Sequence, residues 1–141
     1  MPIPINEPTC KSLGIELLKN GSVHCLYFIT FHRETVQDYL DKLKREDIIR
    51  FDALWARIEK VAKTDKQYLS ENTFRRLKGK IFEIKSHKDR IGCFFVENNG
   101  LILTHGFKKQ TQKTPRKEIK KAEQLMAQYE SMDSNKYGGR Q

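Results

Sequence analysis

Residues 101–115 read Leu-Ile-Leu-Thr-His-Gly-Phe-Lys-Lys-Gln-Thr-Gln-Lys-Thr-Pro, and the rest of the chain is organised around this stretch. It begins as an apolar, strand-like run, breaks at Gly106 and continues as a loop rich in lysines, hydroxyls and amides. It ends on Thr114-Pro115, which indicates a helix start with Thr114 as N-cap and Pro115 at N1. A strand thus brings cations to a helix N-terminus, a common setting for binding polyanions.

Further strands precede this one. Residues 91–96 are apolar and aromatic, and Asn98-Asn-Gly100 predicts a hairpin turn that makes residues 91–96 and 101–107 antiparallel neighbours. Residues 80–85 alternate between polar and apolar side chains. Residues 23–31 are β-branched and aromatic almost without interruption, which predicts a strand buried on both faces.

Helical periodicity occurs in three places. Residues 34–44 and 51–62 each carry an apolar stripe at the i, i+3, i+4 spacing and predict a helical hairpin laid on the sheet. Trp55 lies on the second stripe and is expected to be a core side chain. A final helix from Pro115 carries Ile119, Ala122, Met126 and Tyr129 on one face.

The expected order is β-α-α-β-β-β-α, an α+β fold whose small, mostly antiparallel sheet is covered on one face by the helical hairpin. The other face, or its rim, is left to the basic residues. Residues 23–131 form the single domain. Residues 1–22 hold three of the four prolines and predict an extended arm with room for a short helix near residues 15–18, while residues 132–141 are expected to be a flexible tail.

Positive charge is concentrated in two windows. The 141 residues include 27 Lys and Arg against 18 Asp and Glu, a net charge of +9. Residues 71–90 carry net +4 and residues 108–121 carry net +6, so the rest of the chain is slightly acidic. Charge of this size and distribution favours a polyanionic partner such as nucleic acid.

The sequence lacks the motifs of several classes of metal-binding, nucleotide-binding and hydrolytic proteins. The three cysteines have no metal-ligand or disulfide spacing, and neither a Gly-rich phosphate loop nor an HExxH or Gly-x-Ser-x-Gly motif occurs. We therefore expect no metal and no small-molecule cofactor. No apolar run approaches the roughly 20 residues of a membrane helix, and the N-terminus lacks a signal peptide pattern, so we expect no membrane association and a cytoplasmic location.

Cleavage of RNA without a metal requires a base for the 2′-hydroxyl, cations for the charge on phosphorus, and an acid for the leaving oxygen. Lysines and arginines can supply all three if crowding lowers a lysine pKa. His87 and His105 are further acid/base candidates, although His105 at the end of an apolar strand fits a structural role equally well. Glu83 is expected to pair with a neighbouring cation.

Three segments carry a family resemblance: residues 77–85, residues 89–95 and above all residues 105–115. They resemble the phage-derived, HigB-type branch of the RelE/ParE toxin superfamily, and the likeness extends from about Val23 to Tyr129. The resemblance implies a type II toxin that cleaves mRNA on the ribosome without a metal, and a cognate helix-turn-helix antitoxin. Motif positions of the family match Lys78, Lys80, Arg90, Phe107, Lys108 and Lys109.

These considerations give the candidate site. Lys80, Lys85 and Arg90 are expected to stabilise transition-state charge, and His105 or a lysine to transfer the proton. The RNA is expected to be held by Lys78, Phe107, Lys108, Lys109 and Lys113. Two alternatives remain open: a superfamily member that poisons DNA gyrase through a protein contact, and an inactive basic module that only binds nucleic acid.

Overall fold

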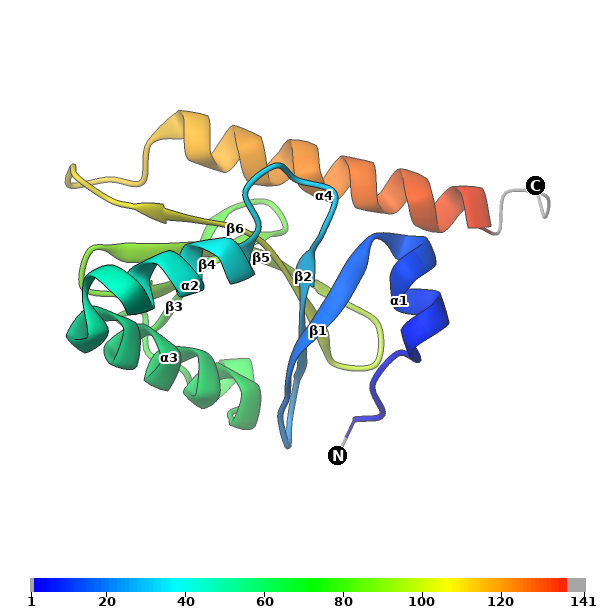
Figure 1. Ribbon diagram of the computed structural model, residues 1–141, viewed down its shortest axis with the longest axis horizontal. Helices are drawn as coiled ribbons and strands as arrows, with labels where there is room; N and C mark the ends of the chain where they lie inside the picture. Colours follow the sequence, from blue (N-terminus) through cyan, green and yellow to red (C-terminus); the bar gives the residue numbers. More distant parts are fainter. Residues whose placement is uncertain (1, 137–141) are drawn as a thin grey trace.

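Six strands form one mixed sheet in the computed structural model, which describes residues 2–136 (Figure 1). Their spatial order is β1-β2-β6-β5-β4-β3, and every neighbouring pair is antiparallel except β2 and β6, which are parallel. The predicted α+β class with a mostly antiparallel sheet is confirmed. The strands are β1 (Ile15–Asn20), β2 (Cys25–Ile29), β3 (Phe74–Lys78), β4 (Ile81–Ser86), β5 (Asp89–Val96) and β6 (Gly100–Lys108).

The predicted helical hairpin covers one face of the sheet. It consists of α2 (Val36–Glu46) and α3 (Ile48–Lys63). Thr35 and Asp38 cap α2 reciprocally, each side chain accepting from the other's backbone N–H at 3.1 and 3.0 Å. Apolar side chains of both helices bury against β2, β4, β5 and β6 in one continuous core. The expected α-α pair between the first long strand and the later ones is therefore present.

The opposite face is also covered, contrary to the expectation that it would be left to basic residues. The long helix α4 (Arg116–Lys136) lies across it beside the short helix α1 (Glu7–Leu13), as Figure 1 shows. Leu13, Phe94, Ile102 and Leu125 belong to the second core that these elements enclose.

Residues 7–20 do not form the extended arm that was predicted. Asn6 caps α1 by accepting from the Thr9 N–H at 2.9 Å, and Gly14 ends the helix in the left-handed conformation, with φ of 70°. The chain then enters β1, which pairs with β2, at the place where a short helix is expected from the sequence. The extended arm was predicted from the prolines in this segment. Pro8, however, lies in the first turn of α1, where a proline is tolerated.

Three further differences concern the later elements. Strand β3 falls in a segment that the sequence does not mark as a strand, because Phe-Arg-Arg-Leu-Lys has no regular alternation. A short 3-10 helix (Lys66–Tyr68) precedes it. Helix α4 continues to Lys136, so the first half of the predicted tail is helical, and residues 137–141 lie outside the described part. No helix within residues 2–136 has a stretch long and apolar enough to cross a bilayer.

A β-bulge in β6 determines which way its last residues point. Ile91 pairs with Gly106 and Cys93 pairs with Leu103, so Gly92 alone faces both Thr104 and His105. A side chain at position 92 would lie 2.6 Å from Thr104 Oγ1, which explains the glycine there. The bulge turns His105 and Phe107 toward α4, and their rings stack with centroids 5.2 Å apart.

Candidate functional site

Strand register brings cations from three strands to the face covered by α4. Arg75 pairs with Glu83, and Lys85 pairs with Arg90. Paired residues share a face of a sheet, as do residues two apart in one strand, so Arg75, Glu83, Lys85 and Arg90 lie together. Lys109 joins them from the loop after β6, where its N–H donates to the Lys88 carbonyl at 2.7 Å. We call Arg75, Lys85, Arg90 and Lys109 the cationic cluster.

Glu83 is the acceptor around which the cluster is built. Its side chain is fully buried, and Arg75 donates to Oε2 at 2.8 Å. Arg90 Nε lies 3.7 Å from Oε1, which also accepts the Thr114 hydroxyl at 2.9 Å. A buried carboxylate with these partners reduces the mutual repulsion of the cations and holds them in one arrangement. The prediction that Glu83 pairs with neighbouring cations is confirmed.

Thr114 differs from its predicted role. Its hydroxyl is bonded to Glu83, and the first carbonyl to accept helical bonds is that of Pro115, from Glu118 and Ile119 N–H at 3.0 and 3.3 Å. Helix α4 accordingly begins at Arg116. The threonine therefore attaches the loop of residues 109–115, which we call the basic loop, to the middle of β4. This attachment fixes the position of the basic loop relative to the cationic cluster.

The crowding of the cluster lowers lysine pKa values. Burial lowers the pKa of Lys85, and the charges of Arg75 and Arg90 lower it further. Burial and the same two arginines lower the pKa of Lys109 as well. Both shifts bring the amines closer to the range in which a lysine can accept a proton, which is the condition set out for metal-free RNA cleavage.

Arg90 is held rigidly at the start of β5. Only 6% of it is exposed, and its Nη1 donates to the carbonyls of His87 and Asp89 at 2.5 and 3.0 Å. Its Nε is buried without a hydrogen-bond partner among the described residues. Burial also lowers its pKa, although the nearby Glu83 opposes that shift. The guanidinium is thus fixed in position, with its buried Nε 3.7 Å from Glu83 Oε1.

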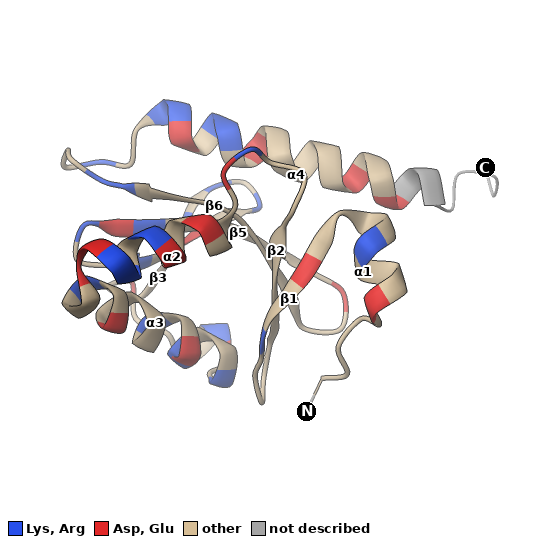
Figure 2. Cartoon of the chain, viewed as in Figure 1, with Lys and Arg blue, Asp and Glu red and all other residues tan. Residues whose placement is uncertain are grey.

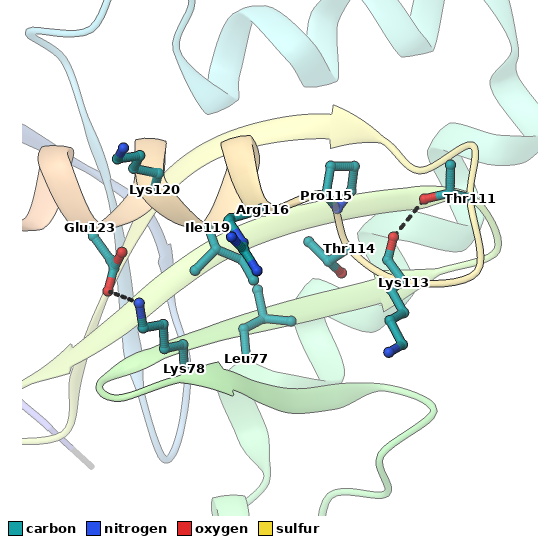
Figure 3. A pocket seen from close by; sticks show the side chains of 10 residues that line it. All are labelled: Leu77, Lys78, Thr111, Lys113, Thr114, Pro115, Arg116, Ile119, Lys120 and Glu123. Carbon is teal, nitrogen blue, oxygen red and sulfur yellow. Dashed lines mark hydrogen bonds and ion pairs between the residues drawn. The ribbon is translucent and has the colours of Figure 1, made fainter.

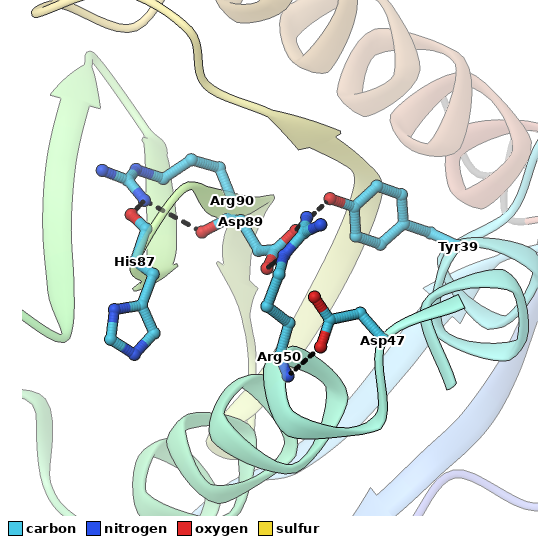
Figure 4. A network of polar contacts seen from close by, with 6 residues as sticks. All are labelled: Tyr39, Asp47, Arg50, His87, Asp89 and Arg90. Atoms are coloured by element: carbon cyan, nitrogen blue, oxygen red, sulfur yellow. Dashed lines mark hydrogen bonds and ion pairs between the residues drawn. The ribbon is translucent and has the colours of Figure 1, made fainter. Parts of the chain in front are cut away.

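The turn that carries Arg90 is anchored to the helical hairpin through Asp89 (Figure 4). The buried Asp89 carboxylate accepts the Tyr39 hydroxyl at 2.5 Å and two bonds from Arg50, at 2.6 and 3.1 Å. Burial and the Asp89 charge raise the pKa of Tyr39, so the hydroxyl remains a donor. Helices α2 and α3 therefore position the β4–β5 turn from the opposite face of the sheet.

A cleft of about 460 Å³ opens beside the cluster. We call it the Arg90 cleft. Its lining residues are all polar or charged and offer guanidinium, ammonium, amide and hydroxyl donors. The lining residues are His87, Lys88, Arg90, Lys109, Gln110, Thr111 and Gln112. A cleft of this composition suits a phosphate group and its neighbouring sugar hydroxyls.

His105 does not open into the Arg90 cleft. It is 2% exposed beneath α4, with Nδ1 3.1 Å from Thr104 Oγ1 and Nε2 3.1 Å from Glu118 Oε1. Burial lowers its pKa to about 4, so the ring is neutral at pH 7 and both nitrogens are occupied. Phe107, which stacks on it, is 7% exposed. This geometry favours the structural alternative for His105 and leaves little of Phe107 for stacking on a base.

The remaining predicted residues lie outside the cluster. Lys80 is exposed in the β3–β4 turn, at the opposite end of β4 from Lys85. Lys108 is exposed and pairs with Asp89, so it points to the face of α2 while Lys109 points to the face of α4. Lys78 and Lys113 line a second hollow, the α4 cleft, between β3 and the start of α4 (Figure 3).

Sequence reasoning missed Arg75 and the organising role of Glu83. Arg75 pairs with Glu83 because residues 74–78 form strand β3. The irregular sequence pattern of β3 does not predict a strand, so the pairing was not predicted either. The available signal was the placement of Glu83 two residues before Lys85, on the same face of a predicted strand. A carboxylate among so many cations indicates a shared ion-pair partner.

Basic residues gather where the loop after β6 meets the β4–β5 turn and the first turns of α4, as Figure 2 shows. Within residues 2–136 no group of three or more His, Cys, Asp and Glu side chains is arranged to hold a metal ion. The site can therefore offer an anion fixed donors, concentrated positive charge and amines of lowered pKa.

A known protein family matches most of the chain. The family described as "Phage derived protein Gp49-like (DUF891)" matches residues 38–127, which is more than half of the chain. The match runs from within α2 to within α4 and includes the whole cationic cluster. No curated protein matches the chain.

Proposed function

The chain belongs to the Gp49-like family of phage-derived, RelE-type toxin-like proteins, and on that premise we propose that it is a toxin that cleaves messenger RNA on the ribosome. The observation that carries the proposal is the cationic cluster around a buried Glu83 beside the Arg90 cleft. Residues 105–115 of the chain resemble the HigB-type branch of these toxins, and we propose that the protein belongs to that branch. The site of action in this proposal is the cytoplasm.

Charge stabilisation falls to Arg90 and Lys85. Attack of a 2′-hydroxyl on the adjacent phosphorus places additional negative charge on the phosphate oxygens, and donors fixed before the reaction stabilise it most. Arg90 is fixed by two carbonyl contacts and lines the cleft. Lys85 pairs with it across the strands and adds a second positive charge. Removing one such donor is expected to slow cleavage by about 100-fold or more.

Proton transfer falls to Lys109 in this proposal. It lines the Arg90 cleft, and burial with two neighbouring arginines lowers its pKa. A neutral amine there can accept the 2′-hydroxyl proton as the 2′-oxygen forms its bond to phosphorus. The bond to the 5′-oxygen breaks on the opposite side of phosphorus, where the leaving oxygen takes a proton from water. His105 is not needed for either step, because both its ring nitrogens are occupied beneath α4.

The test uses a translating extract. Purified protein is added with a reporter mRNA, and the 5′ ends of the fragments are mapped by primer extension. We expect cuts within the translated region at codon boundaries, lost when initiation is blocked and reduced about 100-fold in Arg90→Gln. Intact mRNA, from a protein that still arrests growth when expressed, would contradict the proposal. A gyrase supercoiling assay would then test the protein-contact alternative.

The proposed partner is an antitoxin with a helix-turn-helix. RelE-type toxins typically act in pairs with an antitoxin, and the exposed basic end of this molecule suits a partner segment that carries negative charge. Co-expression with the helix-turn-helix protein encoded next to it should restore growth. Growth arrest that persists despite a stable complex between the two would argue against neutralisation by that partner.

A further inference from the structure

The α4 cleft lies on the other side of the basic loop from the Arg90 cleft. It has a volume of about 780 Å³, within the range of roughly 300–1,000 Å³ that small-ligand sites occupy. One wall is the end of β3 and the other is the first turns of α4, with the loop across one end (Figure 3). Its lining residues are Leu77, Lys78, Thr111, Lys113, Thr114, Pro115, Arg116, Ile119, Lys120 and Glu123.

Positive charge forms the rim of this cleft. Four cations line it, against the single carboxylate of Glu123, which lies 3.9 Å from Lys78 Nζ. Among the described residues, Lys113, Arg116 and Lys120 take part in no ion pair. The N-terminus of the 21-residue α4 adds its partial positive charge at the same place. These groups are suited to bind the phosphates of a nucleic-acid strand that lies along the rim of the α4 cleft.

The floor of the cleft is apolar. Leu77 from β3 lies next to Ile119 from α4, with Pro115 at the loop end, as Figure 3 shows. All three side chains are partly buried, so each presents apolar surface toward the hollow. A flat aromatic base placed against this surface would be removed from water, which is favourable, whereas free phosphate has no apolar group to bury there.

The two clefts meet at the loop between β6 and α4. Thr111 lines both of them, and its hydroxyl donates to the Lys113 carbonyl at 2.6 Å, which holds the loop tip in shape. The Thr114–Glu83 bond fixes the other end of the loop. One strand of nucleic acid can therefore cross the loop with successive phosphates near Lys109 and Lys113.

We propose that the α4 cleft is a nucleotide subsite that holds single-stranded RNA next to the cleaved phosphate, with a base against Leu77 and Ile119 and phosphates on Lys113, Arg116 and Lys120. The inference rests on the proposed function, because it takes the Arg90 cleft as the place of cleavage. It assigns Arg116 and Lys120 to substrate binding, with no part in the chemistry.

Binding of non-cleavable RNA tests the subsite. The probes are fluorescent single strands with a 2′-deoxy sugar at the cleaved position, one that ends there and one extended by three nucleotides. We expect the full-length protein to bind the longer strand about tenfold more tightly. Arg116→Ser with Lys120→Ser should abolish that gain and lower the salt slope by roughly 0.7 for each phosphate that is no longer neutralised. Lys117→Ser with Lys121→Ser, an equal loss of charge on two α4 residues outside the cleft, is the control.

The outcomes separate the subsite from the nuclease. Equal affinities for the two RNA strands would overturn the subsite. So would a control variant that loses as much affinity for the longer strand as the Arg116→Ser, Lys120→Ser variant does. RNA binding unchanged in the double variant, with loss only of antitoxin binding, would assign the cleft to a protein and overturn it too. A length-dependent gain that the double variant loses, in a protein that cuts no mRNA, would leave the subsite standing and remove the proposed nuclease. Where cleavage occurs, the double variant should raise KM and leave kcat unchanged.

Discussion

Thr114 donates its hydroxyl to Oε1 of Glu83 at 2.9 Å, across 31 positions of sequence. The hydrogen bond joins the end of the basic loop to the buried carboxylate that also holds Arg75 and Arg90. Both partners are buried, so the bond is protected from competition by water. Loop position and cluster geometry therefore depend on one another.

Replacing Thr114 by valine should loosen the loop. The change keeps the shape and removes the hydroxyl, which leaves Glu83 Oε1 without one of its donors and costs about 1–2 kcal/mol of stability. We expect the midpoint of urea unfolding to fall and mRNA cleavage to slow because Lys109 and Lys113 are no longer held. Thr114→Ser keeps the hydroxyl and should behave almost as the wild type; if serine and valine have equal effects, the hydrogen bond is not the cause.

Replacing Glu83 by glutamine should separate binding from catalysis. The amide keeps the volume but removes the charge that Arg75 and Arg90 share, and breaking such a buried pair costs about 3 kcal/mol or more. The added net positive charge should hold RNA at least as tightly, while the displaced guanidiniums lower kcat. Cleavage kinetics below the unfolding temperature check this, and a rise in KM with unchanged kcat would show that Glu83 does not position the cluster.

Replacing Lys109 by arginine tests the proton-transfer role. Arginine keeps the positive charge but stays protonated at every accessible pH. As a base Lys109 must be neutral, so the wild-type rate should rise with pH toward its pKa, which burial and the arginines lower. The variant should bind RNA normally, cleave it at least about 100-fold more slowly, and lose that rise. Lys108→Arg, on the opposite face, is the control; a Lys109→Arg enzyme with full activity would exclude the amine as the base.

Replacing Tyr39 by phenylalanine should weaken the attachment of the helical hairpin to the β4–β5 turn. The Asp89 carboxylate would keep Arg50 but lose its second donor, at a cost of about 2 kcal/mol. Urea unfolding measures the loss. Tyr68→Phe removes a hydroxyl from a side chain that is 76% exposed and should leave stability unchanged. Equal effects of the two changes would mean that the Asp89 hydrogen bond contributes nothing specific.

His105 should make the fold sensitive to acid. Its folded-state pKa of about 4 lies below the 6.5 of an exposed histidine because burial opposes the charge. The stability that depends on the neutral ring is present above pH 6.5 and is lost as the pH falls toward 4, by about 2 kcal/mol at pH 5. The midpoints of urea unfolding at pH 7.5 and at pH 5 should differ less in His105→Gln than in the wild-type protein. An unchanged difference would assign the acid sensitivity to other groups.

Much of the fold follows from local patterns. The apolar stripes of α2 and α3, the Asn98-Asn-Gly100 turn and the strand at residues 101–107 each depend on neighbouring residues, and each is where it was predicted. Strands β1 and β3 were missed because both lie at the edges of the sheet, where one partner strand and partial exposure permit an irregular sequence. Edge strands are specified mainly by their neighbours, which a local pattern does not contain.

The sequence predicts which residue types make up the candidate site better than it predicts how they are arranged in space. The basic windows identified Lys85, Arg90 and Lys109, which the structure brings together. The bulge at Thr104 and His105 could not be foreseen, because it depends on Gly92 of the neighbouring strand, and it decides that His105 lies under α4. The alternation of Lys108 and Lys109 between faces likewise depends on strand register, so adjacent lysines of one motif acquire different surroundings.

Strand β6 joins two halves of the sheet that are otherwise separate, because it pairs with β2 on one side and β5 on the other. The parallel pairing places Cys25 beside Gly100, 75 positions later in the chain. Closing so long a loop is entropically costly and slows folding. During synthesis, three of the four clustered cations leave the ribosome before the strand that unites the sheet. The order of synthesis thus delays assembly of the site until β6 and Lys109 have been made.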